Sequence, residues 1–163
     1  MPAILILRHN SFLLTVNQKL VTNLLVSQTI EAEIIAPKEF IALTIASGDA
    51  SRTKLMSTLV RLAQKWPSNV DVIFFEANLG FPGHEDLNET TVKMLEFLID
   101  NYPEALFLLK SHTEQAIINA AKLLKNKGVP VERIISSGSI DAFTDEMKEL
   151  ICDKLTERVA PRP

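Results

Sequence analysis

A repeated alternation of short apolar runs and helix-like stretches fills the last two-thirds of the chain. Each run is rich in residues that favour strands, and apolar residues at three- and four-residue spacing follow it. Such alternation predicts a parallel sheet with helices packed on its faces. The sequence therefore predicts an α/β three-layer sandwich with four parallel βα units, whose strands are Phe40–Ala46, Val70–Phe75, Ala105–Leu109 and Glu132–Ile135.

The first third of the chain does not follow this alternation. Ala3–Leu7 is an unbroken apolar run, a polar break follows at Arg8–Ser11, and Phe12–Val16 is apolar and β-prone again. Short β-prone runs with polar breaks are typical of a β-hairpin or small meander, although a helix is also open for Leu20–Gln28. Ile30–Ala36 alternates partially, which indicates a half-exposed strand. We therefore expect a mixed sheet, with an amino-terminal hairpin or meander ahead of the parallel units.

The size and charge of the chain fit one domain that does not bind nucleic acid. Its 163 residues can bury a sizeable core. The formal net charge is −3, and Lys and Arg are scattered, whereas a nucleic-acid binder usually carries a basic patch. We expect a single domain over residues 1–163, with a linker beginning at 160–163, where two prolines end the last helix.

The single cysteine and the lengths of the apolar runs bear on location. Cys152 is the only cysteine, so an internal disulfide and a Cys-rich zinc site are both excluded. It lies among apolar residues at helical spacing in the last predicted helix, which favours a structural thiol over a reactive one. No apolar run approaches the ~18 residues that a membrane span requires. We expect a cytoplasmic domain, with any membrane segment following this chain rather than lying within it.

Polar residues follow the predicted strands and would meet at one edge of a parallel sheet. The carboxyl ends of parallel strands form the usual ligand edge, and helix amino termini there favour anions. These residues would equally serve as helix caps and turn formers, which such positions need in any case. The candidate ligand edge comprises Asp49, Arg52, Glu76, Lys110, His112 and Ser137.

Two loops at this edge resemble known phosphate-binding and dinucleotide-binding loops only in part. Ser47–Lys54 follows a strand and opens a helix, as a phosphate loop does, but it lacks the second glycine, and Leu55 stands where Ser or Thr would hold magnesium. The Asn78–Gly83 loop has the glycine spacing of a dinucleotide loop without its first glycine. Phe81 at the tip of this loop is a candidate docking residue, because an apolar side chain on a loop either packs onto the core or is available to a partner.

Neither a metal site nor a catalytic centre has its usual spacing in this sequence. His84 and His112 could approach Glu76 and the acids beside His84, but they share no local ligand spacing. The serines after the strands stand outside a Gly-x-Ser-x-Gly elbow. We therefore assign no catalytic residue, no metal and no cofactor.

The order of Ala3–Leu7, the turn Arg8–Ser11 and Phe12–Val16 ahead of βα units resembles half of an actin-like (ribonuclease-H-like) fold. The resemblance covers most of the chain at the level of architecture. A non-catalytic use of that fold is the cytoplasmic domain of assembly-platform proteins in type IV pilus and type II secretion machines. Nucleotide-binding members carry Asp-x-Gly in the corresponding turn, which lacks both residues here. The resemblance implies a binding domain within a larger protein assembly.

Three functions follow from these observations. The first is a non-catalytic interaction domain whose partners are other proteins. The alternative is a small-molecule or nucleotide binder, or an enzyme, that would work through Asp49, Glu76, Lys110 and His112. The third is a receiver-like regulatory domain, which needs an aspartate beside an acidic pair at the strand ends. The strand that should carry that aspartate ends instead in Glu76.

Overall fold

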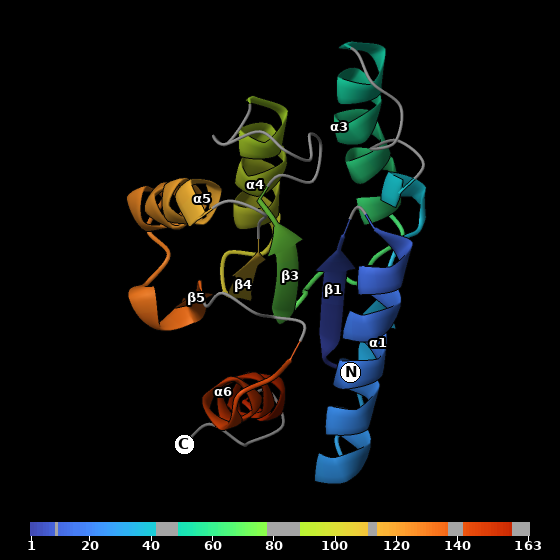
Figure 1. Cartoon of the computed structure of the whole chain (residues 1–163), viewed down its shortest axis with the longest axis vertical. Coiled ribbons are helices and arrows are strands. Elements are labelled where there is room, and N and C mark those ends of the chain that lie inside the picture. The colour runs from blue at the N-terminus through green and yellow to red at the C-terminus, as the bar shows by residue number, and fades with distance from the viewer. Residues whose placement is uncertain (9, 42–48, 78–88, 111–113, 137–141, 158–163) are drawn as a thin grey trace.

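A five-stranded sheet with every neighbouring pair parallel forms the centre of the computed structural model. The structure describes residues 1–8, 10–41, 49–77, 89–110, 114–136 and 142–157. The strand order is β2-β1-β3-β4-β5. Figure 1 labels β1, β3, β4 and β5, which follow one another in this order across the sheet. The strands are β1 (Ala3–Leu7), β2 (Glu33–Ile35), β3 (Val72–Glu76), β4 (Leu106–Lys110) and β5 (Ile134–Ile135).

Helices cover both faces of the sheet and so create two separate apolar cores. Successive side chains of a strand point to opposite faces, so Ile4 and Phe74 pack with α1 and α6, whereas Leu5 and Phe75 pack with α3, α4 and α5. A short 3-10 helix, η1 (Val131–Arg133), precedes β5. The helices are α1 (Ser11–Gln28), α3 (Asp49–Ala63), α4 (Glu89–Asn101), α5 (Glu114–Asn126) and α6 (Asp145–Thr156).

The predicted α/β three-layer sandwich is confirmed, and its central strands fall where their apolar runs indicated. β3 and β4 are buried along nearly their whole length, which is why their sequences are unbroken apolar runs rather than alternating ones. β2 lies within Ile30–Ala36 and is partly exposed, as its mixed pattern predicted. β5 contains only the last two residues of the predicted strand Glu132–Ile135, because the residues before them belong to η1.

The amino-terminal third differs from the expected hairpin or meander. Phe12–Val16 belongs to the first turns of α1, so the sheet is parallel rather than mixed. The Asn10 side chain caps the helix by accepting a hydrogen bond from the Leu13 N–H at 3.1 Å. Leu14, Val21 and Leu25 then fall on one helical face and bury it against the sheet. Packing of this face overrides the local preference of the segment for a strand.

The expected strand at Phe40–Ala46 also differs where the structure describes it. Phe40 and Ile41 lie in a helical turn over 39–41, and residues 42–46 lie outside the described residues. Phe40 is nonetheless fully buried, in the core beneath α3 and α4. Its apolar character therefore reflects burial rather than strand formation.

Candidate functional site at the carboxyl ends of the strands

Three charged residues stand side by side where β1, β3 and β4 end. Leu7 pairs with Phe75 in the register of β1 and β3, which places Arg8, the next residue, beside Glu76. Glu76 in turn pairs with Lys110 across β3 and β4. Because side chains alternate between the two faces, all three belong to the face that α1 covers. The sheet register thus builds a row of alternating charge, positive, negative and positive.

The first two members of this row form an ion pair that is sealed from solvent. Arg8 Nε lies 3.6 Å from Glu76 Oε2, and the two side chains are 0% and 1% exposed. Arg8 Nη1 also donates a hydrogen bond to Asn17 Oδ1 at 2.9 Å. Asn17 projects from α1 and is itself fully buried. The helix therefore holds the guanidinium from one side while the neighbouring strand neutralises it.

A pair buried in this way is structural rather than reactive. Removing two charges from water is costly, and only the mutual attraction of the ions together with further hydrogen bonds offsets that cost. Arg8 therefore offsets part of the cost of burying the Glu76 carboxylate. Lys110 differs from both, because it is only half-buried and can reach solvent along its apolar stem.

The structure brings together two of the predicted edge residues, Glu76 and Lys110. Asp49 and Arg52 lie in the first turn of α3, but their side chains are outside the described part of the chain, as is Phe81. The other members of the predicted edge and of the predicted loops also fall there: His112, Ser137, His84 and the residues of 42–48 and 78–88.

Sequence reasoning missed Arg8 and Asn17, which complete the buried cluster. Arg8 looked like part of a polar turn, although it directly follows five buried strand residues. Asn17 directly follows Phe12–Val16, which we expected to be a strand, whereas it occupies the buried face of α1 together with Leu14 and Val21. The available signal was the period of 3.6 through these positions, which places a polar residue in the middle of an apolar helical face.

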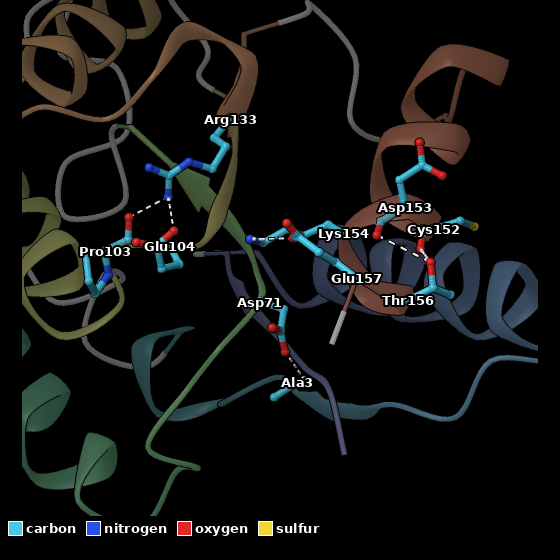
Figure 2. Close-up of polar contacts among 10 residues, drawn as sticks. All are labelled: Ala3, Asp71, Pro103, Glu104, Arg133, Cys152, Asp153, Lys154, Thr156 and Glu157. Carbon is cyan, nitrogen blue, oxygen red and sulfur yellow. Dashed lines mark hydrogen bonds and ion pairs between the residues drawn. The ribbon is translucent and has the colours of Figure 1, made fainter. Parts of the chain in front are cut away.

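A second set of polar contacts lies at the opposite, amino-terminal ends of the strands (Figure 2). Asp71 is 3% exposed, and its Oδ2 accepts a hydrogen bond from the Ala3 N–H at 3.0 Å. The backbone N–H of Asp71 also donates to the carbonyl of Ala3 at 2.9 Å. Asp71 therefore ties the start of β1 to the segment that leads into β3. This carboxylate completes a backbone connection between neighbouring strands.

A cleft of about 360 Å³ lies between α6, η1 and the start of β4. Its two basic side chains are occupied by contacts within the chain: Arg133 donates to the Pro103 carbonyl and pairs with Glu104 at 3.8 Å, and Lys154 pairs with Glu157 at 3.2 Å (Figure 2). The Arg133 contacts join η1 to the segment between α4 and β4, whereas the Lys154–Glu157 pair is local to the end of α6. We assign the cleft no ligand.

Three further observations concern reactivity, metal binding and membranes. Burial raises the pKa of the Cys152 thiol, and the neighbouring Asp153 carboxylate raises it further, which disfavours the nucleophilic thiolate. Within the described ranges, no three or more His, Cys, Asp or Glu side chains are grouped as metal ligands would be. Among the helices that the structure describes, none is both long enough and apolar enough to cross a membrane.

Comparison with known proteins bears on the fold alone. No family model matches the chain, and no curated protein matches it. Among solved structures, it is similar to the crystal structure of a response regulator from Thermotoga maritima, with a TM-score of 0.51 and 11% identity over 96% of this chain and 98% of that one. The strand order 2-1-3-4-5 is the flavodoxin-like one. The expected actin-like membership, and with it the pilus or secretion assembly protein, is therefore wrong, because the likeness spans the whole chain and is to a response regulator.

Proposed function

We propose that this chain is a non-catalytic protein-interaction domain built on a receiver-like fold. The observation that carries the proposal is the buried Arg8–Glu76 ion pair at the carboxyl ends of β1 and β3. In an open parallel sheet, this edge is where a ligand or reacting group would bind. Here, two of its central positions are taken by side chains that neutralise each other.

The same pair argues against a domain that accepts a phosphoryl group. Such a domain needs an exposed aspartate at the end of the middle strand and neighbouring acids whose oxygens bind Mg²⁺. Glu76 holds the strand position and is 1% exposed, which keeps a phosphate donor from its carboxylate. Arg8–Ser11, at the end of β1, contains no acid. A buried guanidinium 3.6 Å from the carboxylate disfavours a second cation there.

Exposed apolar side chains on α1 support binding of another protein. Phe12 and Val26 are 72% and 75% exposed, although large apolar side chains are usually buried. They lie fourteen residues apart, close to four helical turns, and so share one side of the helix. Lys19 is the only charged residue in α1. A long, nearly uncharged helix surface with exposed apolar residues is typical of an interaction surface.

The proposal extends to organisation and location. We take residues 1–163 to form one domain, because both apolar cores are built on the same sheet. We place the protein in the cytoplasm, where a lone half-buried thiol such as Cys152 stays reduced. The partners are proteins rather than nucleic acid, in keeping with the net charge of −3.

Two measurements test this function. The first is thermal unfolding with Mg²⁺ and beryllium fluoride, a phosphoryl mimic, and then with ATP, GTP and inorganic phosphate. Because a ligand that binds the native state must raise its stability, we expect no saturable rise in Tm. A rise that saturates at micromolar ligand would overturn the proposal in favour of a small-molecule binder or phosphoryl acceptor.

The second measurement is photo-crosslinking in the cell of origin. A crosslinking amino acid replaces Phe12 in one variant and, as the control, Lys93, whose side chain is 62% exposed on α4 across the sheet. We expect a discrete protein adduct at position 12 and none at position 93. Absence of an adduct at both positions, or equal adducts at both, would contradict binding through α1.

A further inference from the structure

A groove runs along the edge of the sheet, between α1 and β2. Its volume is about 560 Å³, and most of its lining is apolar: Leu25 and Val26 of α1, with Ile30, Ala32 and Ile34 of the segment that forms β2. Thr22, Thr29 and Glu31 complete the lining. Val26 is 75% exposed although it forms part of the wall. The groove is separate from the Arg8–Glu76 pair at the strand ends.

The backbone of β2 faces outward beside this groove. β2 stands at the end of the strand order and has β1 as its neighbour on one side. The Glu33 N–H donates to the Pro2 carbonyl at 2.9 Å, so the polar groups of Glu33 point toward β1. Because these groups alternate in direction along a strand, the N–H and C=O of Ile34 point away from β1. An edge strand with outward polar groups is a template for one more strand.

The two faces of this edge differ in chemistry. Ile34 packs with the core on the α1 side, and Ile35 packs with the core on the α3 side. Glu33 alternates with Ile34, so its carboxylate belongs to the face away from the groove, and it is exposed. Glu31 is also exposed, but it belongs to the lining of the groove. An added strand would therefore meet a mainly apolar groove with one set of side chains and the Glu33 carboxylate with the other.

We propose that the β2 edge binds an extended segment of a partner protein in which apolar side chains alternate with Lys or Arg. The segment adds to the sheet beside β2, with its backbone pairing to Ile34. Its apolar side chains enter the groove against Val26 and Ile30, and its basic side chains face Glu33 on the opposite side of the strand. This inference rests on the proposed interaction function and names the chemistry of the partner. β2 has three residues, so the recognised segment is short, about five residues.

Selection from a random peptide display library tests the proposal without knowledge of the partner. The probe is the full chain, and the enriched peptides are read for pattern. We expect enrichment of alternating apolar and basic residues. Enrichment of acidic peptides, or of apolar residues at helical spacing of three and four, would overturn the proposal, and so would a failure to enrich any sequence.

Charge and groove variants then locate the binding. Glu33→Lys places a like charge opposite the basic residue of the peptide, so we expect the Kd of the enriched peptide to rise about tenfold. Val26→Lys should weaken binding similarly while leaving Tm unchanged, because Val26 is largely exposed and a cation suits the end of a helix. Glu149→Lys on the exposed surface of α6 is the matched control and should leave Kd unchanged. Equal effects from Glu33→Lys and Glu149→Lys would contradict docking on β2.

Hydrogen exchange separates strand addition from other modes of binding. Exchange of the Ile34 amide should slow when the enriched peptide is bound, because an added strand would accept its hydrogen. Unchanged exchange at Ile34, self-association of the chain abolished by Val26→Lys, or binding to lipid vesicles in place of peptide would each overturn the proposal. None of these outcomes bears on the phosphoryl-mimic and nucleotide titrations, so a failure here remains distinguishable from a failure of the proposed function.

Discussion

At the scale of single residues, the buried Arg8–Glu76 ion pair is the defining feature of the carboxyl ends of the strands. Arg8 is among the largest fully buried side chains of the described residues, and it depends on Glu76 and Asn17 for compensation. A guanidinium cannot shed its proton in a protein, so it cannot adapt to burial by becoming neutral. Loss of a compensating partner therefore leaves the buried charge less well compensated.

Glu76→Gln should lower the free energy of unfolding by about 3–5 kcal/mol, because it removes the carboxylate that lies 3.6 Å from the fully buried Arg8 guanidinium. Glu104→Gln is the matched control, since Glu104 pairs with Arg133 but is 77% exposed, and it should cost less than about 1 kcal/mol. Urea denaturation followed by circular dichroism measures both. The double replacement Arg8→Met with Glu76→Leu should recover most of the loss, because it removes both charges together.

A cost for Glu76→Gln no larger than that for Glu104→Gln would contradict a buried, interdependent pair. So would a double variant whose loss equals the sum of the losses of the two single variants, since residues in one ion pair are not expected to act additively.

At the scale of elements, α1 is the part of the fold least evident in its own sequence. It has no acidic residue in its first turn and no basic residue in its last, so the helix dipole receives no help from charge. Its start depends on the Asn10 cap, and its end on Thr29, whose φ of 55° places it in the left-handed region without being glycine. The Ile30 N–H then donates back to the Leu25 carbonyl at 2.9 Å and closes the last turn.

Asn10→Ala should lower the free energy of unfolding by about 1 kcal/mol, because the Leu13 N–H loses its side-chain acceptor. Asn23→Ala is the matched control in the same helix. Asn23 is exposed in the helix interior, where alanine is the better helix former, so that change should be neutral or raise stability by up to about 0.7 kcal/mol. Urea unfolding of the two variants gives the comparison, and losses of equal size would show that Asn10 is not acting as a cap.

At the scale of the whole molecule, the strand order determines which parts are best protected. β1, β3 and β4 each have a neighbour on both sides, whereas β2 and β5 lie at the two ends of the order. β1 and β3 are buried throughout and contribute to both cores. The centre of the sheet thus combines the most hydrogen bonds with the most apolar contact.

Amide exchange should reflect this arrangement. Amides of β1 and β3 should exchange only through global unfolding, while those of Ile134 and Ile135 in the two-residue strand β5 should open at lower free energy. Native-state hydrogen exchange monitored by NMR at low denaturant concentrations measures both. Protection of β5 equal to that of β1 would contradict the order of stability inferred from the topology.

The sequence alone was informative wherever local pattern and tertiary environment agree. Unbroken apolar runs predicted β3 and β4 because both faces of these strands are covered by helices. The same reading placed Glu76 and Lys110 at the strand ends, where the register sets them side by side. The sequence pattern correctly predicted the α/β layers, whereas the predictions of a mixed sheet and of an actin-like relationship were wrong.

What the sequence determined by itself was therefore the period of each element, two for a strand and 3.6 for a helix, together with the residues available to fill a core. Only the tertiary structure decided that Phe12–Val16 is helical, and that Arg8 meets Glu76 and Asn17. The physical reason is that these outcomes depend on strand order and register, which bring together residues up to 68 positions apart. A local pattern reports how a segment can fold, whereas burial against distant segments selects which of those conformations is stable.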